Sequence, residues 1–150
     1  MPEAEGVVVV RGGANGFVQD ITAGRHRLVA DEPVSAGGED RGPGPYDLLL
    51  AALGSCMSMT IALYARTKKW PLENVVIRLS HSRIYAKDCT DCVTRDDTLL
   101  DRIDTEVELS GALTAEQRSR IMEIAHKCPV HRTLRSEISI GDFAAGEQAQ

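Results

Sequence analysis

Hydrophobic and polar residues alternate with a period of two in two parts of the chain, the pattern of half-buried strands. Near the N-terminus, short apolar stretches separated by Gly-containing turns predict a three-strand meander at Gly6–Val10, Gly16–Thr22 and His26–Ala30. Further on, the alternation predicts two longer strands, Val75–Tyr85 and Ile103–Leu109, joined by a polar loop. Antiparallel sheet therefore accounts for much of the expected fold.

A different pattern occupies the run Leu48–Ala65, which contains no charged residue. A proline favourable in a first helical turn precedes it, and "WPLEN" follows it, so we expect a helix from Pro45 to about Lys69. A helix that is apolar on every side must be covered on every side. One sheet covers one face, so the opposite face needs a second helix or a partner subunit, and we expect a homodimer.

The same run is long enough to cross a membrane, but its Gly, Ser and Thr residues lower its hydrophobicity. The remaining chain is patterned as strands and amphipathic helix, so no membrane association is expected.

The last third of the chain predicts a second helix and a final strand. Thr114 and Gln117 have the spacing of a capping box, and the helix that follows them has an apolar side formed by Ile121, Ile124 and Ala125. Pro129 must stop or bend this helix, and Glu137–Ile140 is expected to form the last strand. The expected fold is a single α+β domain over residues 1–150.

Composition restricts the class of protein. With 43% hydrophobic and 26% charged residues, a chain of 150 residues can bury one core without disulfides. The formal net charge of −5 and the absence of any Lys/Arg block exclude nucleic acid and anionic lipid as expected partners. The N-terminus lacks the pattern of a secretory signal, so we expect a cytoplasmic protein whose four cysteines stay reduced.

The first candidate for chemistry is Cys56, in "LLLAALGSCMSMT". A buried cysteine is usually a small packing residue. Its neighbours Leu53, Met57 and Met59 would also form an apolar pocket around a reactive thiol. Packing and chemistry both remain open from this stretch alone.

The second candidate is Cys128, in "HKCPVHRTL". If Pro129 begins a new helical turn, the Cys128 thiol lies at its N-cap, where free backbone N–H groups favour a thiolate. His131 would then lie on the same side and could hydrogen-bond to the thiol. The alternative is an ordinary helix break in which His126 and His131 cap backbone carbonyls.

The third candidate is the pair Cys89 and Cys92 in "KDCTDC". A Cys-x-x-Cys pair is half of a zinc site or a redox pair, and His81 is the only histidine within plausible reach upstream. Neighbouring aspartates, Asp88 and Asp91, raise thiol pKa values and argue against strong reactivity. Metal binding, a redox role and a loop without catalytic function all remain possible.

Two of these stretches, "GPGPYDLLLAALGSCMSMT" and "CPVHRTL", resemble the two cysteine segments of the OsmC/Ohr family, the osmotically inducible and organic hydroperoxide resistance proteins. The resemblance implies an α+β fold with two central helices, wrapped by antiparallel sheets in an intertwined homodimer. It also implies that Cys56 is oxidised by an organic hydroperoxide to a sulfenic acid and that Cys128 resolves it as a disulfide. A dithiol such as a lipoyl group would restore both thiols, and neither a metal nor a cofactor is implied.

The chain departs from that pattern at two places and is closer to the less characterised OsmC-like branch. Ten residues before the first cysteine the peroxidases of the family have Glu, whereas this chain has Tyr46, followed by Asp47. The family arginine of the first turn matches Ala14, so Arg11, Arg25 and Arg27 are the candidates to replace it.

The function implied is a thiol-dependent organic hydroperoxide reductase of the oxidative stress response. The alternative is a non-catalytic dimer that binds a hydrophobic ligand or senses redox state. Turnover of peroxide with a dithiol separates the two.

Overall fold

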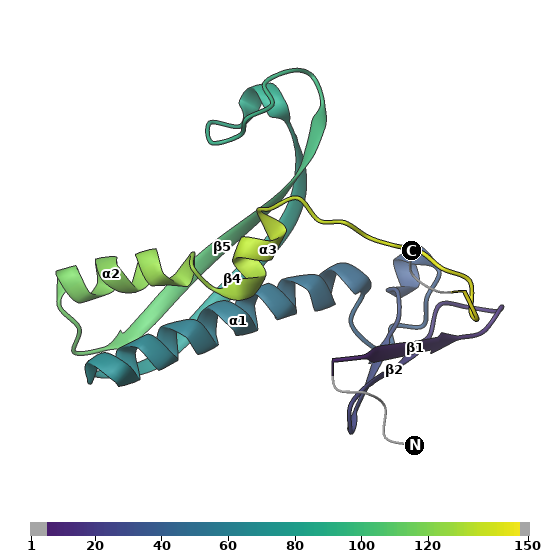
Figure 1. The fold of residues 1–150 in the computed structure, drawn as a ribbon, viewed down its shortest axis with the longest axis horizontal. Coiled ribbons are helices and arrows are strands. Elements are labelled where there is room, and N and C mark those ends of the chain that lie inside the picture. Colours follow the sequence, from purple (N-terminus) through teal and green to yellow (C-terminus); the bar gives the residue numbers. More distant parts are fainter. Residues whose placement is uncertain (1–5, 148–150) are drawn as a thin grey trace. The chain divides into compact units, whose positions relative to one another are not determined.

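The computed structural model describes residues 6–147, which divide into two compact units at Ala51/Ala52. The N-terminal unit is an antiparallel meander of β1 (Val8–Gly12), β2 (Gln19–Ala23) and β3 (His26–Ala30) (Figure 1). The third strand matches the predicted bounds, while the first two begin two or three residues later than predicted. The glycine-rich turn between them includes Phe17 and Val18, which the apolar pattern had assigned to a strand.

The loop after β3 is organised around one buried carboxylate. Asp31 is 2% exposed and accepts backbone N–H groups from Glu32, Glu39 and Arg41, at 2.8, 3.1 and 3.1 Å. Burial by itself raises the pKa of Asp31, but the three backbone hydrogen bonds and the Arg41 charge outweigh it, so the pKa lies below its usual value. One side chain thereby fixes a loop with little regular structure, whose one helical turn is the 3₁₀ segment η1 (Val34–Ala36).

The C-terminal unit is built on a long two-stranded ribbon. Strands β4 (Leu72–Tyr85) and β5 (Leu99–Gly111) pair in antiparallel register, with His81 opposite Ile103, and a loop containing the 3₁₀ turn η2 (Ala86–Asp88) joins them. Both strands were predicted, although each is longer than the stretch of clear alternation.

Helix α1 (Pro45–Lys68) agrees closely with the predicted bounds. It begins in the N-terminal unit and continues through the C-terminal unit. Its end is set by Lys69, whose φ of 56° is left-handed, with the Trp70 N–H bonded to the carbonyl of Ala65 at 2.9 Å.

Helix α2 (Ala115–Ala125) starts with the predicted capping box. The Thr114 hydroxyl accepts the Gln117 N–H at 3.1 Å, and the Gln117 side chain accepts the Thr114 N–H at 2.9 Å. Pro129 opens a separate short helix, α3 (Pro129–Leu134), rather than bending α2. The guanidinium of Arg118 ties α2 to the end of β5 by donating to the carbonyls of Leu109 and Gly111.

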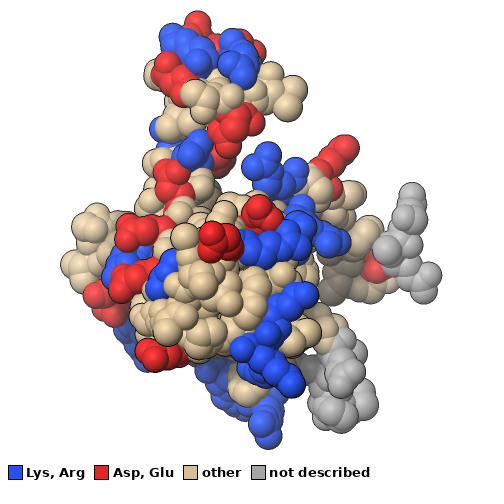
Figure 2. Space-filling view, turned by 90° about the vertical axis from the view of Figure 1, so that its left-hand side faces the viewer, with Lys and Arg blue, Asp and Glu red and all other residues tan. Residues whose placement is uncertain are grey.

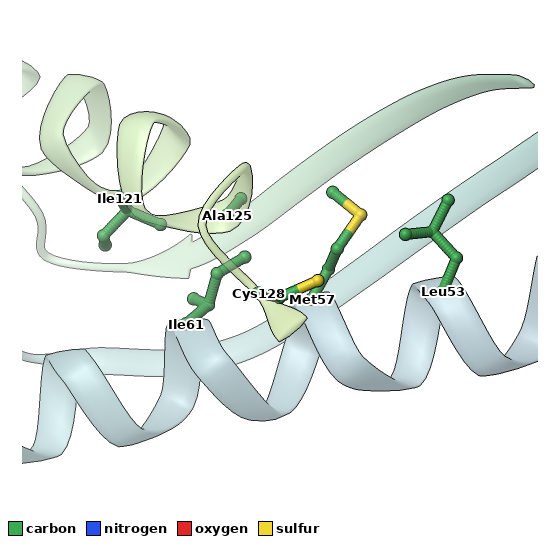
Figure 3. Packing of buried hydrophobic residues seen from close by; sticks show 6 residues of the cluster. All are labelled: Leu53, Met57, Ile61, Ile121, Ala125 and Cys128. Carbon is green, nitrogen blue, oxygen red and sulfur yellow. The ribbon is translucent and has the colours of Figure 1, made fainter. Parts of the chain in front are cut away.

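The core of this unit lies between one face of α1, the two later helices and the ribbon. Figure 3 shows its centre, in which the Cys128 sulfur lies beside Met57 of α1. The buried set is Leu53, Met57, Ile61, Ile121, Ala125 and Cys128. Ile124, predicted on the same side as Ile121 and Ala125, is only partly buried.

The predicted strand Glu137–Ile140 is wrong for the single chain. These residues have no assigned regular structure, and Ile138 and Ile140 are 49% and 78% exposed. Apolar alternation specifies a strand only where a sheet edge pairs with it, and the described chain supplies none to this segment.

Helix α1 leaves a second apolar face uncovered, as its composition led us to expect. Met59 and Leu63, one turn apart, are 71% and 60% exposed. By length and hydropathy α1 qualifies as a membrane span, with 28% of the qualifying window buried. One of its faces, however, forms the centre of the core just described.

Candidate active site

The structure brings Cys56 and Cys128 together although 71 residues separate them in the sequence. Cys56 lies in the middle of α1, is half-buried and packs against the core cluster that contains Cys128. Cys128 is completely buried, and the Cys56 thiol lies near enough to raise its pKa. The site thus holds one half-buried and one buried cysteine in the same cluster.

Cys128 is the N-cap of α3, as the Cys-Pro sequence predicted. Its Sγ accepts the backbone N–H of His131 at 3.3 Å. The expectation of a favoured thiolate is nevertheless wrong, because burial raises the pKa of Cys128, as does the neighbouring Cys56, and the hydrogen bond from the His131 N–H only partly offsets this. Cys128 is held in its thiol form next to a sulfur that solvent can reach.

A hydrogen bond from the imidazole of His131 to Cys128 stays a prediction. The bond that the structure shows comes from the His131 backbone N–H, while its ring lies edge-on to that of His126, with 5.3 Å between the ring centroids. Burial lowers the pKa of His131, and the nearby charges of His126 and Arg135 lower it further. His131 is therefore a neutral ring at physiological pH.

These two histidines, with Arg132 and Arg135, line an open pocket of about 530 Å³ at the end of α3. The two arginines were not predicted as part of a site, because they do not belong to a long run of basic residues. Their spacing of three residues in a helical segment was the available signal.

The acidic and aromatic residues proposed to support Cys56 lie in the first turn of α1. Asp47 accepts the backbone N–H of Gly44 at 2.9 Å and so helps to begin the helix. Tyr46 is 56% exposed. A role in activating Cys56 stays a prediction for both.

The three candidate arginines belong to the N-terminal unit. Arg11 is in β1, Arg25 in the turn after β2 and Arg27 in β3, and all three are exposed. Their part in activating a thiolate also stays a prediction.

The remaining cysteines, Cys89 and Cys92, form a disulfide with 5.4 Å between their Cα atoms. The expectation that all four cysteines are reduced is therefore wrong for this pair, since the tight Cys-x-x-Cys turn brings the two sulfurs within bonding range. His81 does not join them: its Nε2 is 2.8 Å from an oxygen of Asp101. Within residues 6–147, Cys89, Asp91 and Cys92 are the only group of three or more His, Cys, Asp or Glu residues close enough together to hold a metal ion.

Comparison with known proteins agrees with this architecture. The chain is similar in fold to an OsmC-like protein from Mycoplasma pneumoniae, with 19% identity and a TM-score of 0.68, covering 90% of this chain and 89% of that one. It is also similar to an organic hydroperoxide resistance protein OsmC from Legionella pneumophila, with 25% identity and a TM-score of 0.61, covering 86% and 88%.

A third similar structure is the organic hydroperoxide resistance protein OhrB of Bacillus subtilis, at 21% identity and a TM-score of 0.59, covering 86% and 89%. No curated protein sequence matches the chain. The family model described as OsmC-like protein matches residues 37–141, which include Cys56, Cys128 and the whole β4–β5 ribbon. The mixed α+β fold, its antiparallel sheets and this match together place the chain in the OsmC-like family.

Proposed function

We propose that the protein is a thiol-dependent peroxidase that reduces organic hydroperoxides. One observation carries the proposal: two cysteines from distant parts of the chain lie in one cluster, one half-buried on α1 and one completely buried at the start of α3. Packing alone does not require two thiols to meet. A peroxidase that avoids overoxidation often places a resolving thiol beside the reactive one.

In the first step Cys56 attacks the peroxide, because Cys56 is the more accessible of the two sulfurs. Its thiolate attacks the terminal oxygen of the hydroperoxide, the S–O bond forms and the O–O bond breaks. The alkoxide leaving group takes a proton and departs as an alcohol. Cys56 is left as a sulfenic acid, and the peroxide is reduced by two electrons.

In the second step Cys128 attacks the Cys56 sulfur. The S–S bond forms and the hydroxyl of the sulfenic acid leaves as water, taking up the proton that Cys128 releases. The raised pKa of Cys128 suits this order, because a protonated, buried thiol does not compete for the peroxide. A dithiol such as a lipoyl group then reduces the disulfide and is itself oxidised, so that the cycle needs neither metal nor cofactor.

Trapping the intermediates tests the proposal. One equivalent of cumene hydroperoxide should produce a Cys56–Cys128 disulfide that peptide mapping detects. Cys56→Ser should abolish consumption, whereas Cys128→Ser should consume the first equivalent and leave a sulfenic acid that dimedone labels. Dihydrolipoamide should sustain turnover only in the protein that has both thiols.

The matched control is Cys89→Ser/Cys92→Ser, which removes the other two sulfurs and should leave peroxide consumption unchanged. Slow, unselective oxidation without turnover would contradict the peroxidase. It would favour a dimer that binds a hydrophobic ligand or senses redox state through the same cysteine pair.

We further propose that the active form is a cytoplasmic homodimer. The exposed Met59 and Leu63 give α1 an uncovered apolar face that a second copy of the chain would bury. Leu63→Glu should lower the dimer fraction in sedimentation, whereas Thr67→Glu, one turn further along and already polar, should have little effect. A folded wild-type monomer at low concentration would refute the dimer.

A further inference from the structure

The loop that joins β4 to β5, residues 86–98, is a compact structure in its own right and is called the hairpin tip here. The N–H groups of Ala86 and Lys87 donate to the carbonyls of Thr98 and Asp96 at 2.8 and 2.9 Å. Lys87 also pairs with Asp97 at 2.7 Å. In Figure 1 the tip stands clear of α2 and α3, so its chemistry depends on its own residues and on the adjoining strands, Arg102 of β5 among them.

The disulfide within the tip presents its two sulfurs unequally. Cys89 is 2% exposed and lies beside the buried Ala86, whereas Cys92 is only half-buried. Exchange requires a thiolate to approach one sulfur in line with the S–S bond. Solvent access therefore directs the attack to Cys92 and makes Cys89 the leaving group.

The residue that receives the leaving group is Asp91. One of its carboxylate oxygens lies 3.2 Å from the Cys89 sulfur, and Arg102 holds the same oxygen at 3.3 Å. Once the disulfide is broken and Cys89 has taken up a proton, its thiol can donate a hydrogen bond to this carboxylate. The reduced form gains an interaction that the disulfide cannot make, which favours reduction.

A metal site is the competing interpretation, since the donor atoms of Cys89, Asp91 and Cys92 lie within 4.8 Å of one another. Zinc, however, needs deprotonated sulfurs, and these two are bonded to each other. A zinc-bound Cys89 would have to stay a thiolate beside the Asp91 carboxylate, which disfavours one, whereas exchange leaves Cys89 as a protonated thiol that can donate to that carboxylate. The arrangement suits sulfur exchange better than metal binding.

We propose that Cys89 and Cys92 form a second thiol–disulfide exchange centre, separate from the Cys56–Cys128 pair, which accepts two electrons from a small uncharged dithiol. A thiolate of the dithiol attacks the Cys92 sulfur, the Cys89–Cys92 bond breaks, and Cys89 leaves and is protonated. The second thiol of the reductant then attacks the mixed disulfide. Cys92 is released as a thiol, and the reductant departs as a cyclic disulfide.

The charge of the tip supports an uncharged reductant. Four aspartates, at positions 88, 91, 96 and 97, face two basic residues, Lys87 and Arg95, in this segment. Figure 2 shows acidic and basic side chains mixed over the knob at the top of the molecule, without a cationic surface that would attract an anionic thiol. Dithiothreitol should therefore react faster than glutathione at equal thiolate concentration.

The test uses the Cys56→Ser/Cys128→Ser protein, in which the tip cysteines are the only cysteines that remain. Samples equilibrated with dithiothreitol are quenched in acid, and their thiols are alkylated in denaturant and counted by mass. We expect no alkylated thiol without reductant and two with it, while circular dichroism shows that the protein stays folded. Peptide mapping of the oxidised wild-type chain should find the same Cys89–Cys92 link.

The point of attack is tested with each tip cysteine alone. In the same double-serine protein, adding Cys89→Ser leaves only Cys92, and adding Cys92→Ser leaves only Cys89. A small disulfide reagent such as 2-hydroxyethyl disulfide should modify Cys92 at least roughly tenfold faster than Cys89, because burial hinders access. Equal rates, or faster reaction of Cys89, would overturn the assigned direction.

The role of Asp91 as a positioning residue is tested by Asp91→Ala, with Asp88→Ala as the matched control in the same loop. Loss of the hydrogen-bond acceptor should raise the dithiothreitol concentration for half-reduction by roughly three- to tenfold. Within residues 6–147 the Asp88 carboxylate makes no hydrogen bond to either sulfur, so the control should leave this concentration unchanged.

Two results would overturn the exchange centre as a whole. One is a disulfide that dithiothreitol reduces only after the protein is denatured. The other is a reduced protein that retains one equivalent of added zinc through gel filtration with both tip thiols protected from alkylation, which would make the tip a metal site.

Discussion

Helix α1 lies close to the ribbon at Gly54, two residues before Cys56. A Cβ added there would lie 2.6 Å from Cδ1 of Leu79 on β4, against about 3.5 Å or more for carbon atoms in favourable contact. The next nearest atoms, also of Leu79, are at 3.7 and 3.8 Å, which is ordinary contact. The only close contact that Gly54→Ala would make is with the end of the Leu79 side chain. The free-energy cost of that contact can therefore be measured by shortening Leu79.

Two opposing contributions decide the effect of Gly54→Ala on the free energy of unfolding. Alanine stabilises a helix interior by about 1 kcal/mol relative to glycine. Displacing the Leu79 methyl group costs about 1–3 kcal/mol, as for other overpacked cores. We expect a net destabilisation of about 0–2 kcal/mol in the wild-type background.

The sign should reverse once Leu79 is shortened. In Leu79→Ala protein the obstructing carbon is absent, so Gly54→Ala should stabilise by about 0.5–1 kcal/mol. The four proteins form a double-mutant cycle, measured by urea unfolding at one protomer concentration because association contributes to stability. A coupling below about 0.5 kcal/mol would refute the close approach of α1 to β4.

Three further predictions concern other parts of the chain. Thr114→Ala removes the capping box of α2 and should lower the free energy of unfolding by about 1 kcal/mol in urea titration, with Ser restoring most of it. Asp31→Asn replaces an acceptor oxygen with a donor and should lower the urea midpoint at pH 7. The pKa of Asp31 is below 3.8 in the folded protein, so the stability that its carboxylate contributes is present above the unfolded pKa and is lost as pH falls through the folded pKa. Wild type and variant should therefore converge in strong acid. Cumene hydroperoxide should oxidise Cys56 faster than hydrogen peroxide does in stopped-flow measurements, because apolar Leu53 and Met57 adjoin it; equal second-order rates would contradict an apolar substrate pocket.

The elements that sequence patterns predicted well are those whose signals are local. The Thr114 capping box, the Cys-Pro N-cap and the long charge-free helix each depend on neighbouring residues, and each is present in the structure. The segment Glu137–Ile140 failed because strand formation depends on a partner that local alternation does not reveal. The predicted strand boundaries were too short for the same reason. Leu72 and Leu99 belong to β4 and β5 because they pair with the opposite strand, not because they continue the apolar alternation.

The chemistry of the candidate site was harder to predict than the fold. The N-cap position of Cys128 was predictable, but the direction of its pKa was not, because burial depends on how α1, α2 and α3 pack together. The disulfide of Cys89 and Cys92 and the arginines of the α3 pocket depend equally on local geometry in three dimensions. Residue type indicated which groups could react, and packing determined in which state they are held.

The sulfur of Cys128 also holds the first turn of α3, which has six residues and too few internal hydrogen bonds to persist alone. Bonding that sulfur to Cys56 would draw electron density from the atom that accepts the His131 N–H. Oxidation would thus loosen the helix start at the same moment as it closes the disulfide. Amide hydrogen exchange at His131 would then report the oxidation state of the buried pair from the backbone, without any label on sulfur.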